Sequence, residues 1–472
     1  MSFSVDPAAL LSAGDPDQTG SPRTVVVGGG IAGLTAAHLL GVDGARPLLL
    51  EAGDRLGGKL RLQEVAGVAV DVGAEAMLNR RPEGVDLARE LGLPIVHPTS
   101  AESQILSRGS LHPLPRTLMG IPLDLDDLTA SGVLSDEGLD AVRREPSLPV
   151  TVVEGDVSVG EVVAARFGDE VVDRLVEPLL GGVYSGLAWE ISTRAAVPML
   201  LPMLAKGSLL EQGARIPRTY DAPVFACVEG GMGRLPGALE DSGRFEARTD
   251  VRVTSLRRSG PGFVVVADGQ EIVADRLVLA TPPAETARLL APIAPDAAAD
   301  LAAIESASTV VVTFAFRAAD VPDLPGSGFL VPPVEAGRRV KASTFSFAKW
   351  GWVREAGRGA GPEGEDLLFL RTSLGRHRES AVGALSDDEL VAVSLAELAD
   401  AVGLRAEPLA THVQRWTDGL PQYAVGHVDR VARVRAAVAR IPGLAVCGAA
   451  YDGVGIPAVI ASAAVAAESL TG

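Results

Sequence analysis

The chain has few of the residues from which disulfide frameworks and metal sites are built. It contains two cysteines, Cys227 and Cys447, and six histidines in 472 residues. The cysteines form no Cys-x-x-Cys pair, and no two histidines lie three or four residues apart. Metal sites of the common kinds use such spacings, so we expect no metal ion. Two unpaired cysteines suit a reducing compartment, and the expected location is cytoplasmic.

Aromatic residues, net positive charge and long apolar runs are also scarce. Aromatic residues make up 4% of the chain, and 60 acidic against 42 basic side chains give a net charge of −18. A nucleic-acid partner is therefore not expected, because a polyanion needs a basic face. No run approaches the ~18 apolar residues of a membrane span, so no integral membrane segment is expected. The most apolar piece, residues 195–204, contains two prolines and could be a surface patch, a channel wall or plain core.

The N-terminus lacks the features of a targeting signal. Residues 1–20 are rich in Ser, Asp, Pro and Gly, without a basic start or an apolar core. We expect them to form a flexible extension. The rest of the chain is long and apolar enough, with 47% hydrophobic residues, to fold into two or three domains.

Glycine and short β-branched runs, by contrast, are plentiful, and near the N-terminus they form one recognisable unit. Residues 24–27 predict a buried strand and residues 31–40 an apolar helix, with the pattern Gly28-x-Gly30-x-x-Gly33 between them. Such a strand–turn–helix binds the pyrophosphate of a dinucleotide. The glycines let the backbone approach the phosphates, and the first helical N–H groups face them.

Two features favour a dinucleotide site over the alternative, a glycine-rich loop in an ordinary α/β protein. A second predicted strand, over residues 47–50, ends in Glu51, where an acid is expected to meet a ribose hydroxyl. Shortly afterwards, Arg55 and Lys59 flank a glycine pair at 57–58, which permits close backbone approach beside positive charge.

The C-terminal part also contains a buried strand followed by a glycine turn. Residues 444–447 predict the strand, Gly448, Gly453 and Gly455 follow, and Pro457 suits the first turn of a helix. A helix N-terminus carries roughly half a positive charge and would stabilise an anionic reduced flavin ring. We therefore expect FAD rather than NAD, because a nicotinamide dehydrogenase does not need its C-terminus to return to the N-terminal unit.

The order of the predicted elements gives a fold class of α/β plus α. We expect a Rossmann-like FAD-binding domain, a mixed-sheet substrate domain and a helical domain. The expected boundaries are 1–20 for the extension, 21–78, 223–295 and 412–472 for the discontinuous FAD-binding domain, 79–222 for the mostly helical domain with its active-site loops, and 296–411 for the substrate-binding domain.

Several local signals lie outside the glycine turns. Strands are predicted over residues 308–316, 340–347 and 367–372, and a short helix over residues 170–177. A longer helix is predicted over residues 386–402, because its start, Ser-x-x-Glu, is a capping box and a glycine follows its end.

Further motifs make the chain resemble a known family. The spacing Glu51-x3-Arg55-x-Gly57-Gly58 resembles the signature of the flavin-dependent amine-oxidase superfamily. Over residues 23–470 the chain is similar to the protoporphyrinogen/coproporphyrinogen oxidases, most of all to the Gram-positive bacterial coproporphyrinogen III oxidases. The motifs that carry the narrower resemblance are Arg415-Trp416, Pro421-Gln422-Tyr423 with His427, Asp452 to Pro457, Gly182-Val183-Tyr184, Gly230-Gly231-Met232 with Leu235-Pro236, and Thr344-Phe345 with Lys349-Trp350.

The resemblance completes the expected cofactor site. It implies that Arg55 lies near the FAD pyrophosphate, that the segment from Gly73 reaches the flavin edge, and that the main chain of Val251 contacts adenine. The full expected set is Gly28, Gly29, Gly30, Ile31, Ala32, Gly33, Glu51, Ala52, Arg55, Gly57, Gly58, Lys59, Gly73, Ala74, Glu75, Val251, Trp416, Gly448, Gly453, Val454, Gly455, Ile456 and Pro457.

The resemblance also implies the reaction, which is oxidation of a porphyrinogen to a porphyrin in haem biosynthesis with O2 as acceptor and H2O2 as product. Flavin N5 takes the hydride, so no catalytic protein residue is expected, which suits a chain without an obvious His/Asp dyad. A flat substrate that carries carboxylates needs an apolar slot with basic residues at its rim. The candidates are Arg80, Arg81, Tyr184, Lys349 and Trp350, for each of which packing or surface charge is an equally good explanation.

The substrate and the rival functions stay open at this point. We prefer coproporphyrinogen III, because a chain without membrane anchors suits the more soluble tetracarboxylate; protoporphyrinogen IX is the near alternative. More distant alternatives are a flavin amine oxidase, a carotenoid desaturase and a non-catalytic flavoprotein. Transient contact with other haem-pathway enzymes is a further expectation.

Overall fold

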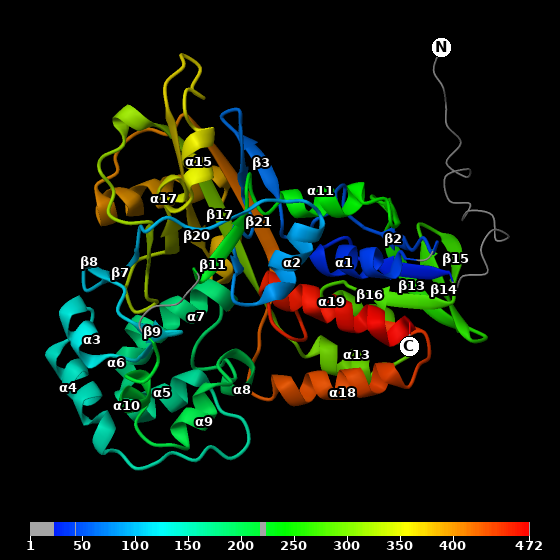
Figure 1. Cartoon of the computed structure of the whole chain (residues 1–472), viewed down its shortest axis with the longest axis horizontal. Coiled ribbons are helices and arrows are strands. Elements are labelled where there is room, and N and C mark those ends of the chain that lie inside the picture. Colours follow the sequence, from blue (N-terminus) through cyan, green and yellow to red (C-terminus); the bar gives the residue numbers. More distant parts are fainter. Residues whose placement is uncertain (1–22, 43, 218–222, 472) are drawn as a thin grey trace.

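A five-stranded parallel sheet forms the centre of one half of the molecule (Figure 1). The computed structural model describes residues 23–42, 44–217 and 223–471, so the expected N-terminal extension lies outside the described residues. The strands, in spatial order, are β12 (Glu246–Arg248), β2 (Leu48–Leu50), β1 (Thr24–Val27), β16 (Arg276–Leu279) and β22 (Leu444–Val446). Each pairing is parallel, and β1 is the middle strand.

Alternate side chains of β1 enter two different cores, one on each face of this sheet. Val26 packs with α1 and α19, whereas Val25 and Val27 pack on the opposite side. Strands buried on both faces read as continuous apolar runs, which is why residues 24–27 show no polar alternation. The helices on the Val26 side are α1 (Ile31–Leu40), α2 (Pro82–Glu90), α11 (Arg234–Asp241) and α19 (Ile456–Thr471); those on the other side are α12 (Pro283–Leu290), α13 (Pro295–Ala302) and α18 (His427–Ala439).

Smaller sheets attach to this layered unit. They are β3 (Leu62–Val65) with β4 (Val68–Asp71), β5 (Met77–Leu78) with β11 (Phe225–Val228) and β6 (Ile95–Val96), and the antiparallel set β13 (Val253–Ser259), β14 (Gly262–Ala267) and β15 (Gln270–Ala274).

A seven-stranded sheet forms the upper part of Figure 1. Its strands, in spatial order, are β21 (Ala410–Pro421), β17 (Ser306–Arg317), β20 (Leu367–Leu374), β19 (Val340–Thr344), β18 (Gly328–Leu330), β7 (Ser103–Ser107) and β8 (Ser110–Pro113). All neighbours are antiparallel except β18 and β7, so the sheet is mixed. The helices beside it are η4 (Ala318–Asp320), α14 (Ser346–Lys349), α15 (Gly351–Ala356), α16 (Ser380–Gly383) and α17 (Asp387–Val402). The capping box is confirmed, with Ser386 before α17 and Gly403 in the left-handed conformation after it.

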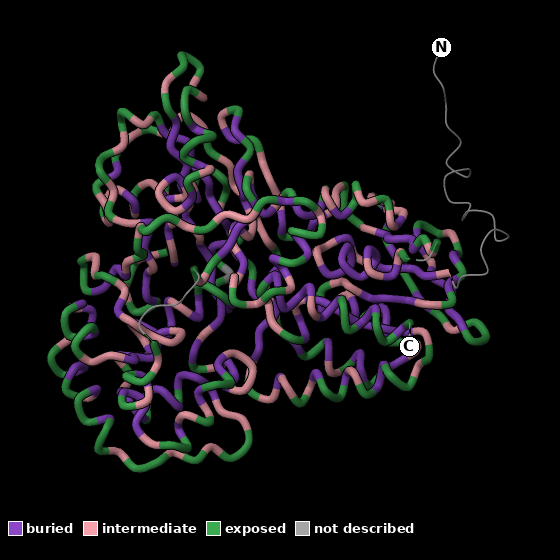
Figure 2. The backbone as a smooth tube through the Cα atoms, viewed as in Figure 1, coloured by how far each residue is buried: buried purple, intermediate pink, exposed green. Residues whose placement is uncertain are grey.

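A group of short helices around one apolar cluster occupies the lower left of Figure 1. Its elements are β9 (Thr117–Leu118), β10 (Ile121–Pro122), α3 (Leu125–Ser131), α4 (Asp136–Arg144), η2 (Glu145–Ser147), α5 (Val159–Phe167), α6 (Asp169–Val171), η3 (Val172–Val176), α7 (Glu177–Tyr184), α8 (Thr193–Ala196), α9 (Leu200–Leu204) and α10 (Leu209–Gly213). Figure 2 shows buried residues continuing from this group through the central strands into the parallel sheet. Among the described residues, no helix is both long and apolar enough to cross a membrane.

The structure corrects the expected elements in three places. Strands β7 and β8 come from the segment expected to be helical, and β21 comes from the segment expected to start the last FAD-binding part; both join the seven-stranded sheet. The helix expected over 170–177 continues to Tyr184 through a π-helical turn. Pro178 explains that turn, because its ring and missing N–H prevent a regular α-helical bond.

Gly33 offers a test of the packing between β1 and α1. A Cβ added at Gly33 would lie 1.9 Å from the Gly28 carbonyl oxygen, so helix and strand would have to separate. We expect Gly33→Ala to lower the thermal midpoint by about 1–3 °C, as overpacking by ~1–3 kcal/mol does in a chain of this length. The matched control is Gly237→Ala in α11, where a Cβ meets nothing within 4 Å. The control should keep or slightly raise the midpoint; equal midpoints for both variants would contradict the packing argument.

Candidate functional site

Two glycine-rich loops lie against each other where β1 and β2 end. The Gly57 amide donates to the Gly29 carbonyl over 2.8 Å. Gly57 and Gly58 have positive φ angles of 105° and 55°, and a Cβ at Gly58 would lie 3.1 Å from the Gly30 Cα. Glycine is therefore required here for both conformation and close approach.

Glu51 holds the first of these loops in place. One of its carboxylate oxygens accepts the Gly29 amide at 2.6 Å, and the other accepts the Gly53 amide at 2.7 Å. An ionised carboxylate has about four acceptor positions, so capacity remains for a ribose hydroxyl. Ala52, beside it, is exposed. The predicted ribose ligand is thus also a structural part of the loop.

The start of α1 fits a pyrophosphate. Gly30 precedes the helix, no side chain caps the helix, and its first turn contains no acidic residue. A Cβ at Gly30 would meet no atom within 4 Å, so open space lies in front of the helix. The N–H groups of this turn, which includes Ile31, Ala32 and Gly33, lack partners within the helix. An uncapped helix N-terminus that faces open space is a binding site for an anion such as the FAD pyrophosphate.

The two basic residues of the second loop have different surroundings. The Arg55 guanidinium donates to the carbonyls of Leu56 at 2.9 Å and Gly58 at 2.6 Å, so it stabilises the loop and supplies charge. Lys59 is exposed to solvent, yet the protein atoms around it lower its pKa by desolvation. Lys59 thus supplies positive charge beside the glycine loops.

Val251 lies next to Glu51 at the expected adenine end. Its amide donates to the Glu51 carbonyl over 2.9 Å, and its side chain is buried. Because the amide is already used, the expected main-chain contact to adenine would have to come from the carbonyl group.

The segment Gly73-Ala74-Glu75 is anchored from two sides. The Ala74 amide donates to the Lys59 carbonyl at 3.1 Å, and Arg371 Nη1 donates to the Gly73 carbonyl at 2.7 Å. Glu75 pairs with Lys349 at 2.8 Å and with Arg371 at 3.2 Å. Burial opposes ionisation of Glu75, but the two cations outweigh it and lower its pKa to about 2. The segment expected to reach the flavin edge is therefore fixed by a buried carboxylate between two cations.

Trp416 lies against the same segment. A Cβ at Gly73 would be 3.1 Å from the Trp416 ring, and the indole N–H donates to the Val72 carbonyl at 3.4 Å. Although Trp416 belongs to β21 of the seven-stranded sheet, it thus contacts the expected cofactor segment, which is consistent with its predicted role.

The C-terminal glycine turn closes on the N-terminal loop. A Cβ at Gly448 would find Ala32 of α1 as its only neighbour within 4 Å, at 3.9 Å. Tyr423 holds the turn, because its hydroxyl donates to the Ala449 carbonyl at 2.7 Å and accepts the Gly453 amide at 2.8 Å. The remaining expected residues have mixed surroundings: Val454 packs against the helical cluster, Gly455 has open space, and Ile456 and Pro457 are buried at the start of α19.

The residues expected to bind substrate do not all meet at one surface. Arg80 is exposed and has no hydrogen bond or ion pair to any described residue, whereas Arg81 is half-exposed and pairs with Glu83 at 2.7 Å. Both precede α2, in which Gly84 lies against Pro457 of α19, so they lie close to the C-terminal turn.

The other three candidates are more enclosed. Tyr184 is 6% exposed, and its ring lies 5.6 Å from that of Tyr423. Lys349 is neutralised by Glu75. Trp350 is only 1% exposed. The structure therefore places Trp350 in the core and not at a substrate surface, which corrects that part of the prediction.

Sequence reasoning missed two residues that organise this region, Arg371 and Tyr423. Arg371 is the one charged residue within the apolar strand β20, a signal that could have marked it as functional. Tyr423 appears in the sequence only as part of a family motif, because nothing in the sequence shows that its hydroxyl reaches the turn at Gly453.

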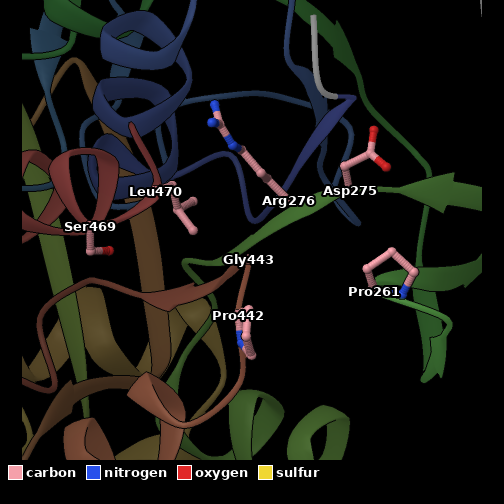
Figure 3. Close-up of a pocket in the computed structure, with 7 residues that line it drawn as sticks. All are labelled: Pro261, Asp275, Arg276, Pro442, Gly443, Ser469 and Leu470. Carbon is pink, nitrogen blue, oxygen red and sulfur yellow. The ribbon is translucent and has the colours of Figure 1, made fainter. Parts of the chain in front are cut away.

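Two further observations concern other kinds of site. No group of three or more metal-ligating side chains occurs within the described ranges. A surface pocket, drawn in Figure 3, lies among Pro261, Asp275, Arg276, Pro442, Gly443, Ser469 and Leu470. These residues lie around the first ends of β16 and β22, in the turn between β13 and β14, and near the end of α19, so the pocket is at the opposite edge of the parallel sheet from the glycine loops. Ligands of such sheets bind at the carboxyl edge, and we assign no cofactor to this pocket.

Replacement of Glu51 tests the ADP half of the site. Glu51→Gln keeps the shape but removes the charge that accepts two amide hydrogen bonds, each worth ~1.5–3 kcal/mol. We expect the Kd of the apoprotein for FAD to rise at least about tenfold, measured by titration of flavin fluorescence. Glu64→Gln, on the exposed side of β3, is the matched control and should leave the Kd unchanged. An unaltered Kd in Glu51→Gln would remove Glu51 from the site.

Comparisons with known proteins agree with this arrangement. Residues 31–471 match the family model described as flavin containing amine oxidoreductase. The coproporphyrinogen III oxidase of Mycobacterium leprae is 39% identical, with 94% of this chain and 97% of the relative covered; that of Bacillus subtilis is 29% identical, with 93% and 95% covered. A crystal structure of a proposed protoporphyrinogen oxidase from Exiguobacterium sp. 255-15 has 33% identity and a TM-score of 0.84, with 95% and 98% covered.

The cofactor follows from the family and from the fit of the glycine loops, Glu51 and the uncapped α1, and it is FAD. Residues of both ends of the chain would hold it. The chain belongs to the flavin-containing amine oxidoreductases, and within them to the porphyrinogen-oxidising family.

Proposed function

We propose that this enzyme oxidises coproporphyrinogen III to coproporphyrin III in haem biosynthesis, with O2 as electron acceptor and H2O2 as product. The observation that carries the proposal is the 39% identity to a coproporphyrinogen III oxidase across 94% of the chain. The relatives of this name extend from Mycobacterium to Bacillus and Staphylococcus. Protoporphyrinogen IX is the second candidate, because the similar solved structure is a proposed oxidase of that substrate.

The bound FAD would supply the acceptor for a hydride from a methylene bridge of the substrate. The glycine loops and α1 would hold its pyrophosphate, and Glu51 its ribose. The Gly73-Ala74-Glu75 segment, fixed by Arg371, would define one border of the reaction site. The task of the chain is to orient the substrate and exclude water, since positioning alone accounts for a large part of such a rate enhancement.

The side chains near this region support a reaction without a strong protein base. Burial raises the pKa of the Tyr184 hydroxyl to about 12, so this group stays protonated at neutral pH. Burial and the neighbouring Arg430 lower the pKa of His427 to about 4, and its ring stacks on Tyr423 at 3.8 Å. Pyrrole protons would leave to solvent or to imine nitrogens of the substrate itself.

Arg80 and Arg81 are our candidates for substrate carboxylates. They lie at the start of α2, whose first turn contacts the first turn of α19, and Arg80 has a guanidinium without a described partner. A guanidinium matches a carboxylate in a bidentate fork. Lys349 contributes less, because Glu75 already neutralises it.

The rival functions have weaker support. Amine oxidases need an aromatic cage, and the part of Tyr184 and Trp350 that reaches solvent is too small to form one. A carotenoid desaturase would need a long apolar tunnel. Only a measurement of turnover distinguishes a non-catalytic flavoprotein from these enzymes. Cytoplasmic location and contact with other pathway enzymes stay predictions.

Turnover of the two porphyrinogens tests the proposal. Holoenzyme should oxidise coproporphyrinogen III with kcat/KM about tenfold above that for protoporphyrinogen IX, because a site built for charged groups discriminates against their loss. Porphyrin fluorescence measures the product, and an oxygen electrode with a peroxide assay measures the acceptor. No turnover of either substrate by protein with full FAD content would refute the oxidase function. Preference for the dicarboxylate would make protoporphyrinogen IX the substrate. Turnover without O2 consumption would refute the proposal that O2 is the electron acceptor.

Alanine variants test the two arginines. We expect Arg80→Ala or Arg81→Ala to raise KM about fivefold or more, with kcat changed less than about twofold, because uniform substrate binding is lost. Steady-state kinetics with the preferred porphyrinogen measure this. Arg89→Ala is the matched control, since Arg89 lies exposed on the same helix and pairs only with Asp86. If KM stays constant in both variants, neither arginine binds substrate.

A further inference from the structure

A small cavity lies beside Glu75, the last residue of the Gly73-Ala74-Glu75 segment. It is lined by Val70, Asp71, Glu75, Thr313, Ser346, Trp350, Trp352, Val353 and Phe369. The cavity leaves about 10 Å³ for the centre of a water molecule, which is enough for one water. The lining comes from the FAD-binding strand β4, from β17 and β20 of the seven-stranded sheet, and from α14 and α15 with Trp350 between them.

Three of the residues that line this cavity each have a buried polar atom without a hydrogen-bond partner in the described structure. These atoms are the Thr313 hydroxyl and the indole N–H groups of Trp350 and Trp352. An unsatisfied buried donor or acceptor costs ~1–3 kcal/mol, so three around one cavity call for an explanation. The Trp350 indole is close enough to Glu75 to help lower its pKa, yet no direct hydrogen bond joins them. The Trp352 indole lies near the Cys227 sulfur, which is a weak acceptor.

Two carboxylates complete the lining, and both have structural tasks. Asp71 accepts the amides of Met232 at 2.8 Å and Gly233 at 2.9 Å, at the N-terminus of α11. Glu75 holds Lys349 and Arg371, and Ser346 lies 3.3 Å from its second oxygen. Each carboxylate therefore faces the cavity while it fixes a different part of the chain.

We propose that this cavity binds one water molecule, which joins Thr313, the two indole N–H groups and the carboxylates into one hydrogen-bonded cluster. A water fits because it both donates and accepts: the indoles can only donate, and the ionised Glu75 carboxylate can only accept. A cation does not fit, since indole N–H groups cannot ligate it and Lys349 and Arg371 already balance Glu75. The site is independent of the substrate and of the electron acceptor.

The consequence of this water concerns the position of the cofactor segment. Glu75 and Arg371 fix the Gly73 carbonyl and thus the segment expected at the flavin edge. The water would orient Glu75 from its buried side and connect it to Asp71, at the start of α11. The water would thereby connect β4 to the seven-stranded sheet through hydrogen bonds.

A pair of substitutions at Thr313 tests the site. Thr313→Val keeps the shape and removes the hydroxyl, whereas Thr313→Ser keeps the hydroxyl and removes the methyl group. In a high-resolution crystal structure of wild-type holoprotein we expect one solvent atom within hydrogen-bond distance of the Thr313 hydroxyl and at least one indole N–H. We expect the same atom in Thr313→Ser and none in Thr313→Val.

Stability and cofactor affinity give a second readout. Thr313→Val should raise the Kd for FAD about fivefold, the equivalent of one net hydrogen bond, and Thr313→Ser should restore it to within about twofold of wild type. Thr411→Val, at an exposed position of the neighbouring strand β21, is the control. An empty cavity in the wild-type holoprotein, or a solvent atom that persists in Thr313→Val, would overturn the proposal. So would equal loss of FAD affinity in both Thr313 variants, because packing would then explain the effect.

Discussion

The hydrogen bond from the Gly57 amide to the Gly29 carbonyl is the contact on which the rest of the structure depends. It brings the turn after β1 against the loop after β2. Glu51 holds the turn after β1, because its carboxylate accepts the Gly29 amide. Only glycine allows the separation found there, as the 3.1 Å between a Cβ at Gly58 and the Gly30 Cα shows. The uncapped start of α1 is left with open space in front of it because the second loop passes beside it and does not cover it.

Two sets of contacts connect this junction to the rest of the site. One is the group of ion pairs at Glu75, and the other is the pair of hydrogen bonds made by Tyr423. Toward the seven-stranded sheet, Glu75 forms ion pairs with Lys349 and Arg371, which lie far from it in the sequence. Arg371 also donates a hydrogen bond to the Gly73 carbonyl. Toward the C-terminal turn, Tyr423 joins Ala449 and Gly453 and places its ring near Tyr184. The border of the reaction site is therefore rigid where it meets the cofactor, because its charged groups are paired with one another.

The sequence predicts the FAD cofactor and its glycine turns directly, but it does not show the surroundings of the side chains proposed for the substrate, for a physical reason. The turns at Gly28 and Gly448 follow from local constraints, since strand, glycine spacing and helix start lie within a few residues of one another. The α17 capping box was predictable in the same way. The surroundings of three other side chains depend on tertiary contacts, and the sequence around them does not show whether they face a ligand or the core. These are Arg371, Lys349 and Trp350. The same applies to β7 and β8. They form a hairpin, but β18, the strand that joins β7 to the sheet, is far away in the sequence, so a segment expected to be helical became part of a sheet.

The order of strands in the parallel sheet has a consequence for biosynthesis. β16 lies between β1, made early, and β22, made last among the strands, and α1 finds its neighbour α19 only after β22 has formed. A nascent chain therefore carries its glycine loop, with β1 and α1 complete, for most of the time of translation before the flavin half of the cradle exists. Contacts between such distant segments form slowly and leave apolar surface uncovered in the meantime. FAD, which residues from both ends of the chain would hold, would stabilise the last docking step by mass action.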